Sequence, residues 1–468
     1  MDLGAPFFCI GIYLYTSYRI LEKDSYYYTW RKVFMKEKTP SKAIKNAGSV
    51  LWSYLQKTLF SDFTSFLKWL LISLLCGIVI GAAGTAFHFA VSGAEFLRGQ
   101  YHWLFLLLPV GGLCIAFLYC HSGMENDAGT DMVLFSVRSE TQISWKTAPL
   151  IFLSTVITHL LGGSAGREGA ALQLGGSLGQ VLGRRLHLDI KDMHIITLCG
   201  MSAGFAALFG TPMTAAIFAM EVISVGVMYY AALVPCVFSA IIASQISSAF
   251  GSKPTSFLLP EKFIPDISPL LIVQAVVLSA FCALLSIAVC LVFHKISLLY
   301  RKYLPNLYLR SVVGGALVAL LMLLLQTTDY LGAGMSVIQN AINGQARPEA
   351  FILKTLLTAL TLGAGFKGGE IVPSFFIGAT FGCTISTLLG LPPELSAALG
   401  LVALFCGVTN CPIASFILSL ELFGGQGCLF FLLAVSISYT LSGYYGLYSK
   451  QKILYSKTRP VFIDTQTK

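Results

Sequence analysis

The chain has 468 residues, of which 56% are hydrophobic and 11% are charged. Soluble domains are about one quarter charged, so this composition, with a mean hydropathy of +0.75, excludes an ordinary soluble protein and predicts a polytopic membrane protein. The formal net charge is +9, and basic residues cluster near the two ends of the chain. The positive-inside rule therefore predicts that both termini are cytoplasmic. Membrane orientation explains these clusters better than nucleic-acid binding, and no nucleic-acid partner is expected.

Strongly apolar runs recur along the chain and are expected to form membrane helices. They cover residues 69–91, 102–119, 149–161, 231–246, 270–292, 312–325 and 429–441. A helix that crosses a bilayer needs about 20 apolar residues, and several of these runs are shorter or are broken by Gly and Pro. The pattern predicts tilted or re-entrant helices in place of a regular bundle.

The charge and hydropathy pattern divides the chain into four parts. These are a basic N-terminal cytoplasmic or interfacial segment with an apolar start (1–62), a first transmembrane half (63–250), a second transmembrane half (251–448) and a basic cytoplasmic tail (449–468). Twelve cysteines are scattered through apolar runs without a CxxC spacing, which is typical of small buried hydrophobic residues. Neither a metal site nor a cofactor is predicted.

A glycine-rich motif at residues 162–169 reads GGSAGREG and lies inside an apolar stretch. It places Arg167 and Glu168 at membrane depth, where ionisable side chains are costly and therefore mark functional sites. Glycine-rich backbone that opens into a helix presents free N–H groups and the positive end of the helix dipole, which bind anions. Gly166 and Gly169 flank the charged pair and leave room for the glutamate side chain to move.

Two stretches of the chain, residues 200–222 and 400–422, align without a gap. The coincident pairs are Gly200/Gly400, Ala203/Ala403, Phe205/Phe405, Pro212/Pro412, Ile217/Ile417 and Glu221/Glu421. Each stretch predicts an apolar helix, a break at a proline and a second helix that ends in glutamate. The GREG motif has a weaker counterpart at residues 364–370. Duplicated halves with matching interrupted helices are typical of transporters whose binding site lies at the membrane midplane.

These motifs together resemble the CLC family of chloride channels and proton-coupled anion antiporters, over roughly residues 65–450. Residues 166–169 are similar to the family's GREGP element, with Ala170 in place of the proline. Residues 369–373 resemble its GxFxP element, with Ile371 in place of the phenylalanine. The second element, with its glutamate and the residues just before it, looks like that of the fluoride-transporting bacterial branch.

The resemblance implies an all-α polytopic fold in the cell membrane of a bacterium. Two inverted halves of tilted and broken helices would surround the anion, with helix N-termini pointing at it. The implied assembly is a homodimer with one pore per subunit. The chain is therefore expected to be a transporter and not an enzyme, with fluoride or chloride, protons and the lipid bilayer as its partners.

The resemblance also assigns roles to individual residues. Glu168 is the expected gate, because a carboxylate can occupy an anion site and leave it on protonation. Glu370 is a candidate second proton relay, and its backbone N–H and that of Ile371 are expected to bind the anion. Thr130 stands where the family has an anion-binding serine, and Tyr448 resembles the tyrosine whose hydroxyl binds the anion. The supporting motif residues are Gly166, Arg167, Gly169, Gly369, Val372 and Pro373.

Structural roles are the alternatives for these residues. They are an ion pair of Glu168 with Arg167, a helix N-cap at Thr130, an ion pair of Glu370 with Lys367, and an interfacial aromatic belt around Tyr448. Chloride/proton antiporters of the family carry an inner glutamate where this chain has Val222. The neighbouring Glu221 and its repeat partner Glu421 are expected to cap or pair structurally, and His159 is expected to pack between helices.

The leading hypothesis is a secondary active transporter that exchanges fluoride for protons and expels fluoride. The alternative is a chloride/proton antiporter or a passive chloride channel of the same family, which Thr130 would suit. An intramembrane serine protease built on Ser164 and His159 is a third class, but its nucleophile element is incomplete, and the chain has no HExxH or P-loop motif. A purely structural scaffold does not explain ionisable residues such as Glu168 and Glu370 at membrane depth.

Overall fold

The computed structural model describes residues 40–257 and 259–468. By its internal contacts the chain divides into two units, residues 1–69 and 70–468, and every site discussed below lies in the second. The apolar start expected within residues 1–62 falls outside the described residues. The first described helix, α3, covers Pro40–Gln100 and continues into the second unit.

The second unit is built mainly from helices, as the sequence predicts, with three short strands that it does not predict. Up to residue 249 the elements after α3 are η1 (His102–Leu107), α4 (Leu108–His121), α5 (Thr130–Ser136), α6 (Thr147–Leu160), α7 (Glu168–Arg185), α8 (Ile190–Phe209), α9 (Pro212–Glu221), β1 (Ser224–Val225), η2 (Tyr230–Ala232) and α10 (Leu233–Ala249).

The remaining elements complete the chain. They are η3 (Glu261–Phe263), α11 (Pro269–Tyr303), α12 (Leu307–Leu325), α13 (Met335–Ile342), α14 (Ala350–Gly363), α15 (Ile371–Leu389), α16 (Pro393–Thr409), α17 (Pro412–Phe423), α18 (Cys428–Leu441), β2 (Lys452–Tyr455) and β3 (Phe462–Gln466). Helices α3–α10 and α11–α18 follow one another in the same order, and each set contains a short helix that begins at the proline of the repeat, α9 or α17.

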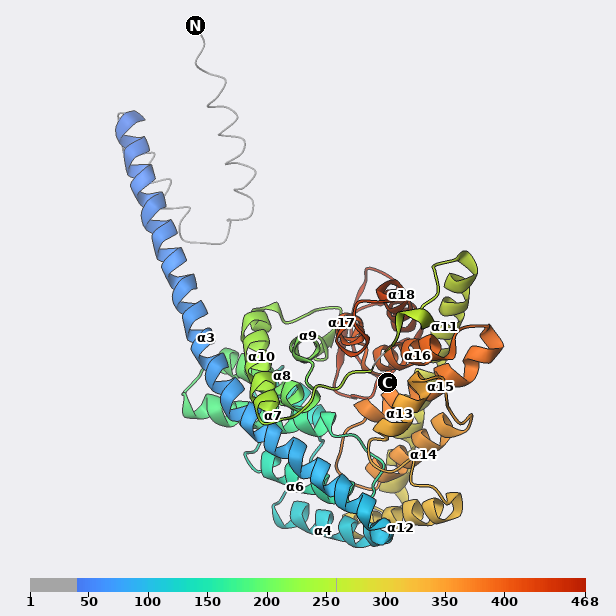
Figure 1. Cartoon of the computed structure of the whole chain (residues 1–468). Helices are drawn as coiled ribbons and strands as arrows, with labels where there is room; N and C mark the ends of the chain where they lie inside the picture. The colour runs from blue at the N-terminus through green and yellow to red at the C-terminus, as the bar shows by residue number, and fades with distance from the viewer. Residues whose placement is uncertain (1–39, 258) are drawn as a thin grey trace. The chain divides into compact units, whose positions relative to one another are not determined.

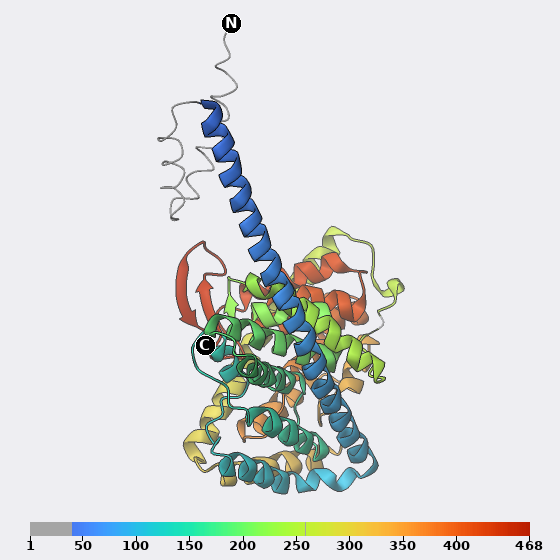
Figure 2. The same ribbon diagram turned by 90° about the vertical axis from the view of Figure 1, so that its left-hand side faces the viewer.

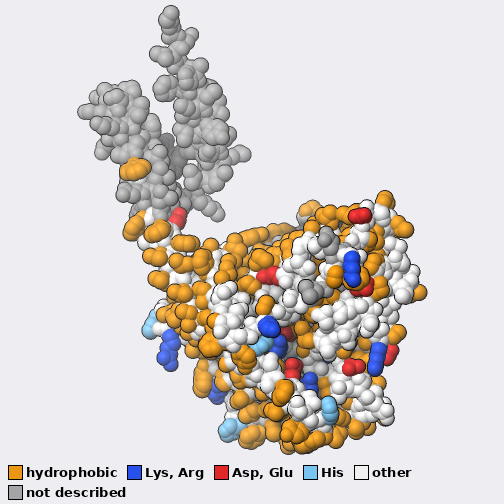
Figure 3. Space-filling view, viewed as in Figure 1, with side chains coloured by type: hydrophobic (Ala, Val, Ile, Leu, Met, Phe, Trp, Pro, Cys, Tyr) orange, Lys and Arg blue, Asp and Glu red, His pale blue; other side chains and the backbone are white. Residues whose placement is uncertain are grey.

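Within the described part of the chain, seven helices are long and apolar enough to cross a membrane. Several others are shorter: α6 and α18 have 14 residues each, as the broken apolar runs predict. The chain is therefore a multi-pass membrane protein with both full-length and short helices. Hydrophobic side chains cover much of the surface seen in Figure 3, with few charged groups between them.

Helices α8 and α16 form the centre of the second unit. The most apolar part of α8 is 83% buried, whereas the corresponding part of the span formed by η1 and α4 is 33% buried. Helix α8 packs against α7 and α10, and α16 packs against α15, α11 and α18 (Figure 1). Glycines allow the closest approach: a Cβ atom on Gly175 would overlap the carbonyl oxygen of Gly200, and one on Gly378 would overlap that of Gly400.

The two glutamates of the repeat exchange caps between the halves. The Glu221 carboxylate accepts hydrogen bonds from the backbone N–H groups of Ile413 (3.1 Å) and Ala414 (2.8 Å) at the start of α17. The Glu421 carboxylate accepts from Met213 (2.9 Å) and Thr214 (2.8 Å) at the start of α9. Negative charge at a helix N-terminus is stabilising, so the expected structural role is confirmed.

Replacing Glu221 with Ala should lower the free energy of unfolding by about 2 kcal/mol, because two N–H groups at the start of α17 lose their acceptor. Thermal unfolding of the detergent-purified protein measures this loss. Glu221→Gln is the matched control, because its amide oxygen keeps one acceptor and should cost less. An Ala variant as stable as the parent would contradict the capping role.

The C-terminal segment folds into a small sheet with the chain order β1-β2-β3. β1 pairs in parallel with β2, and β2 pairs antiparallel with β3, which are the red arrows in Figure 2. The side chain of Gln451, just before β2, donates to the carbonyl oxygens of Val222 (3.0 Å) and Thr409 (2.8 Å). The segment predicted as a basic tail is therefore attached to the ends of α9 and α16.

Candidate functional site

The two glycine motifs meet at a backbone bridge. The N–H of Gly166 donates to the carbonyl oxygen of Gly369 at 2.7 Å, and the N–H of Gly369 donates back to Gly166 at 2.7 Å. Helix α7 begins at Glu168, two residues after one glycine, and α15 begins at Ile371, two residues after the other. The bridge therefore brings the N-termini of two helices, one from each half, to the same point.

Glu168 lies at this bridge and is 1% exposed. Its Oε2 atom accepts a hydrogen bond from the backbone N–H of Arg167 at 3.0 Å. The Arg167 guanidinium is more distant: its Nε atom is 3.8 Å from Glu168 Oε1, and its Nη1 atom donates to Ser92 of α3 at 3.3 Å. The backbone N–H is thus the nearer partner, and the Arg167–Glu168 ion pair is long.

Thr130 is the first residue of α5, and Gly129 is the N-cap, so the predicted alternative of a Thr130 N-cap is wrong. Its hydroxyl oxygen instead accepts a hydrogen bond from the side-chain amide of Gln173 at 3.1 Å. Thr130 Oγ1 would lie 3.5 Å from a Cβ atom on Gly169. Because the amide occupies a lone pair of the hydroxyl oxygen, the hydroxyl hydrogen is available to donate to an anion.

Glu370 is the N-cap residue of α15 and reaches the same junction. Its Oε2 atom would lie 3.6 Å from a Cβ atom on Gly169. The alternative of an ion pair with Lys367 is wrong, because the Lys367 ammonium pairs with Asp127 at 3.0 Å and lies over the ring of Tyr119. Glu370 therefore faces the first-half motif with its charge not neutralised by that lysine.

The apolar residues of the second motif line the back of the junction. Ile371 and Val372 are fully buried in the first turn of α15. The Cδ atom of Pro373 would lie 2.9 Å from a Cβ atom on Gly166. These apolar side chains pack against the Gly166–Gly369 bridge. The polar groups that the first turn of α15 offers at the junction are therefore those of its backbone.

Tyr448 is 2% exposed, and its hydroxyl has no hydrogen-bond partner among the described residues. The ring lies near enough to Glu370, Asp131 and Glu168 to interact with their charges. Its backbone carbonyl accepts from Thr467 near the end of the chain. A buried hydroxyl without a protein partner, next to a helix junction, is suited to donate to a bound ion. Burial of this kind does not fit an interfacial aromatic belt.

Asp131 connects the Thr130 helix to the Tyr448 segment. Its carboxylate accepts from the Ser449 hydroxyl at 2.6 Å and from the backbone N–H of Lys450 at 3.0 Å. The Arg138 guanidinium donates to the carbonyl oxygen of Lys450 from the same helix region. These contacts fix the position of Tyr448 relative to Thr130.

The structure thus brings Thr130, Glu168, Glu370 and Tyr448 to one region. The segments that carry them are far apart in sequence: the contact between Asp131 and Ser449 joins residues that are 318 positions apart. The sequence analysis did not identify Gln173, which donates to Thr130, or Asp131, which accepts from Ser449 and Lys450. Gln173 is a polar residue in the glycine- and alanine-rich α7, one helical turn after Gly169, and that spacing is the signal that identifies it. Asp131 has no comparable signal, because its partners are remote in sequence.

The protease alternative is not supported by the positions of its two residues. The Ser164 hydroxyl hydrogen-bonds the Thr358 hydroxyl at 3.0 Å. The His159 ring contacts Glu95 and the Gly166 carbonyl oxygen. Neither group is bonded to the other, so the nucleophile–base contact that such chemistry needs is not present.

Comparison with known proteins identifies the fold. A family profile described as "Voltage gated chloride channel" matches residues 122–443. The "Chloride/fluoride channel protein" of Pseudomonas syringae pv. tomato is 34% identical over 398 residues, which is 83% of this chain and 87% of that protein. The "H(+)/Cl(-) exchange transporter ClcA" of Vibrio cholerae is 24% identical over 388 residues, or 75% of this chain and 81% of that protein.

Solved structures agree with these relatives. The crystal structure of a CLC-type fluoride/proton antiporter superposes with a TM-score of 0.80 at 32% identity, and covers 83% of this chain and 98% of that one. The structure of a slow cyanobacterial Cl⁻/H⁺ antiporter superposes with a TM-score of 0.68 at 20% identity, over 80% of this chain and 94% of that one, and supports the fold. With an inverted repeat of tilted and broken helices and both glycine motifs at its centre, this chain belongs to the CLC family of voltage gated chloride channels and antiporters.

Proposed function

We propose that this protein is a secondary active transporter that exchanges fluoride for protons across the cell membrane of a bacterium, with Glu168 as its protonatable gate. The carrying observation is the hydrogen bond from the Arg167 backbone N–H to the Glu168 carboxylate. A free N–H at the start of a helix is a binding group for an anion, and here a carboxylate occupies it. The side chain therefore stands in for the transported ion.

This arrangement couples the ion to the proton. An ionised Glu168 competes with an anion for the same donors. A protonated Glu168 accepts more weakly and leaves the N–H groups to the anion. Each exchange of anion for carboxylate therefore requires that Glu168 change its protonation state. The Thr130 and Tyr448 hydroxyls supply further donors for the ion near the bridge.

Fluoride is the proposed ion for three reasons. Two relatives, at 34% and 32% identity, have fluoride in their printed names. Glu370 places a second carboxylate at the junction, which is a second group that can take up a proton beside a strongly basic anion. Val222, at the place of the inner glutamate of chloride/proton antiporters, is an apolar buried residue, and Glu221 beside it is used as a cap.

The proposal extends to the assembly and its orientation. We expect a homodimer with one anion pathway per subunit and both termini in the cytoplasm, with the first and second repeat halves at residues 63–250 and 251–448. Mass measurement of the purified protein in detergent tests the dimer. Protease or labelling access to tags in sealed vesicles tests the orientation.

Purified protein in liposomes should move fluoride at least about ten times faster than chloride, and an outward fluoride gradient should drive protons inward against their own gradient. Ion-selective electrodes for fluoride, chloride and protons measure the three fluxes. Protein-free liposomes at the same pH give the leak of neutral HF, which must be subtracted. Chloride flux faster than fluoride flux would instead support a chloride/proton antiporter, and chloride flux without proton movement would support a channel.

A further inference from the structure

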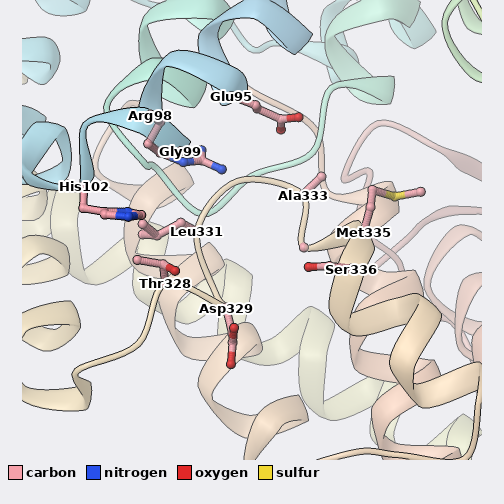
Figure 4. Close-up of a pocket in the computed structure, with 11 residues that line it drawn as sticks. Glu95, Arg98, Gly99, His102, Thr328, Asp329, Leu331, Ala333, Met335 and Ser336 are labelled. Atoms are coloured by element: carbon pink, nitrogen blue, oxygen red, sulfur yellow. The ribbon is translucent and has the colours of Figure 1, made fainter.

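A pocket with a volume of about 330 Å³ opens near the gate motif, on the side of α3. Glu95 and Arg98 of α3 point into it, opposite the loop that carries Asp329 and Leu331 (Figure 4). The Glu95 side chain is 29% exposed there. The pocket therefore gives water access to one carboxylate that the proposed transport cycle does not use.

His159 lies directly behind Glu95 and is fully buried. Its Nδ1 atom is 2.9 Å from Glu95 Oε1, and its Nε2 atom is 3.2 Å from the carbonyl oxygen of Gly166. A carbonyl oxygen only accepts hydrogen bonds, and an ionised carboxylate does the same. The ring can therefore make both contacts only if the pair holds one proton more than a neutral imidazole and an ionised carboxylate. This shared proton is held either by Nδ1 of the ring or by Glu95.

The second contact of this ring is part of the gate. The Gly166 carbonyl oxygen accepts a hydrogen bond from the histidine ring and a second one from the N–H of Gly369. A Cβ atom on Gly166 would lie only 2.8 Å from Glu168 Oε2, so the gate carboxylate contacts the same residue. The Arg98 guanidinium donates to the backbone carbonyl of His159 at 2.7 Å and fixes the end of α6.

We propose that His159 and Glu95 are a positioning pair that holds one proton, exchanges it with water through the pocket at Glu95, and thereby fixes the Gly166 bend that presents Glu168. The inference rests on the proposed role of Glu168 as the gate. The pair does not contact the transported ion; it acts through the Gly166 carbonyl.

Other charged groups set the field around the pair. On α3, Arg98 and His88 interact electrostatically with Glu95. On the glycine motif, Arg167 interacts with Glu95 and Glu168 interacts with His159. From α14, the fully buried Lys354 Nζ atom donates to the carbonyl oxygens of Tyr330 (3.1 Å) and Gly332 (2.6 Å) in the pocket loop. These surrounding groups are the same in the parent and in the variants, so a difference in pH profile between the two proteins cannot come from them.

Loss of the shared proton has a definite consequence. A neutral imidazole beside an ionised Glu95 can donate to the carboxylate or to Gly166, but not to both. A pair that has lost the proton therefore holds Gly166 more weakly than a pair that has kept it, and alkaline pH favours the loss.

Glu95→Gln separates the hydrogen bonds from the proton. The glutamine amide can donate to Nδ1 of a neutral imidazole, whose Nε2–H still donates to Gly166, so the geometry survives without a titratable carboxyl. The variant should transport like the parent at acidic pH. At alkaline pH its fall in transport rate should be about fivefold smaller than that of the parent, because the loss of roughly one hydrogen bond changes a rate by about that factor. Fluoride flux in liposomes over a pH series measures this.

Two further variants complete the experiment. Asp329→Asn is the matched control, because Asp329 lines the same pocket but pairs with Arg347 at 3.8 Å, and it should follow the parent at every pH. His159→Phe removes both contacts and should slow transport at every pH, while thermal unfolding reports whether it is folded. In the parent, the ¹⁵N spectrum of labelled His159 should show hydrogen on Nε2, the nitrogen that faces the Gly166 carbonyl.

A Glu95→Gln variant with the pH profile of the parent would overturn the positioning role, and so would a His159 spectrum in which one ring nitrogen is bare while Glu95 is ionised. If Glu168→Gln is uncoupled and Glu95→Gln still follows the parent, this inference fails and the proposed function stands. If Glu168→Gln remains coupled, the proposed function itself fails.

Discussion

Glu168→Gln should carry fluoride without carrying protons. The glutamine is nearly the same size and cannot take up or release a proton, so it resembles the protonated gate in every step. Fluoride should then move only down its own gradient, while proton flux falls to the level of protein-free liposomes. Simultaneous recording with fluoride and pH electrodes measures the ratio of the two fluxes.

Glu140→Gln is the control for this experiment, because Glu140 is an exposed glutamate outside the helices. It should keep the proton-to-fluoride ratio of the parent. Glu370→Gln is the informative comparison. If Glu370 is the second proton relay, this variant should slow proton and fluoride movement together, because the gate still titrates. Unchanged proton coupling in Glu168→Gln would show that another group carries the proton.

Gly175→Ala should destabilise the protein by about 3 kcal/mol or more, at the upper end of the cost of overpacking. Its Cβ atom would overlap the carbonyl oxygen of Gly200, and the next atoms it meets are also backbone atoms of α8. Backbone cannot move aside as a flexible side chain can, so α7 and α8 must separate along their length. Because α7 starts at Glu168, the separation should also displace the gate.

Thermal unfolding of the purified protein and its yield as a single species measure this effect. Gly93→Ala is the matched control. Gly93 is also a glycine inside a helix, but it is exposed, and apart from its chain neighbours and the nearby backbone of its own helix no described atom lies within 4 Å of the position that its Cβ atom would take. Alanine favours a helix over glycine by about 1 kcal/mol, so this variant should be as stable as the parent or more stable. Equal stability of the two variants would contradict the packing argument.

The centre of the site could be predicted from the sequence because its residues break the local pattern. Arg167 and Glu168 stand out as charges in an apolar run, and the paired prolines and glutamates of residues 200–222 and 400–422 identify the repeat. Glycines at matching places predicted the bends. Such signals are local, and each can be read from a few adjacent residues.

The rest of the site depends on contacts between distant segments. Lys367 pairs with Asp127 in preference to Glu370, which is only three positions away in sequence. Only the fold brings Lys367 and Asp127 together. Asp131 has no signal of its own, because its partner Ser449 lies 318 positions away. His159 was expected to pack between helices, because nothing near it in sequence reveals Glu95, 64 positions away. The strands β1–β3 are too short to produce a pattern of their own.

The exchange of caps by Glu221 and Glu421 also bears on the origin of the fold. Each half supplies the carboxylate that the other half needs, and the two contacts are equivalent. This reciprocity is the defining property of an interface between two identical subunits related by a two-fold axis. A half-length ancestor paired with an inverted copy of itself would make the same two contacts between chains. The interior of this protein therefore has the contact pattern of a two-fold symmetric dimer interface, with one glutamate of each half at equivalent positions.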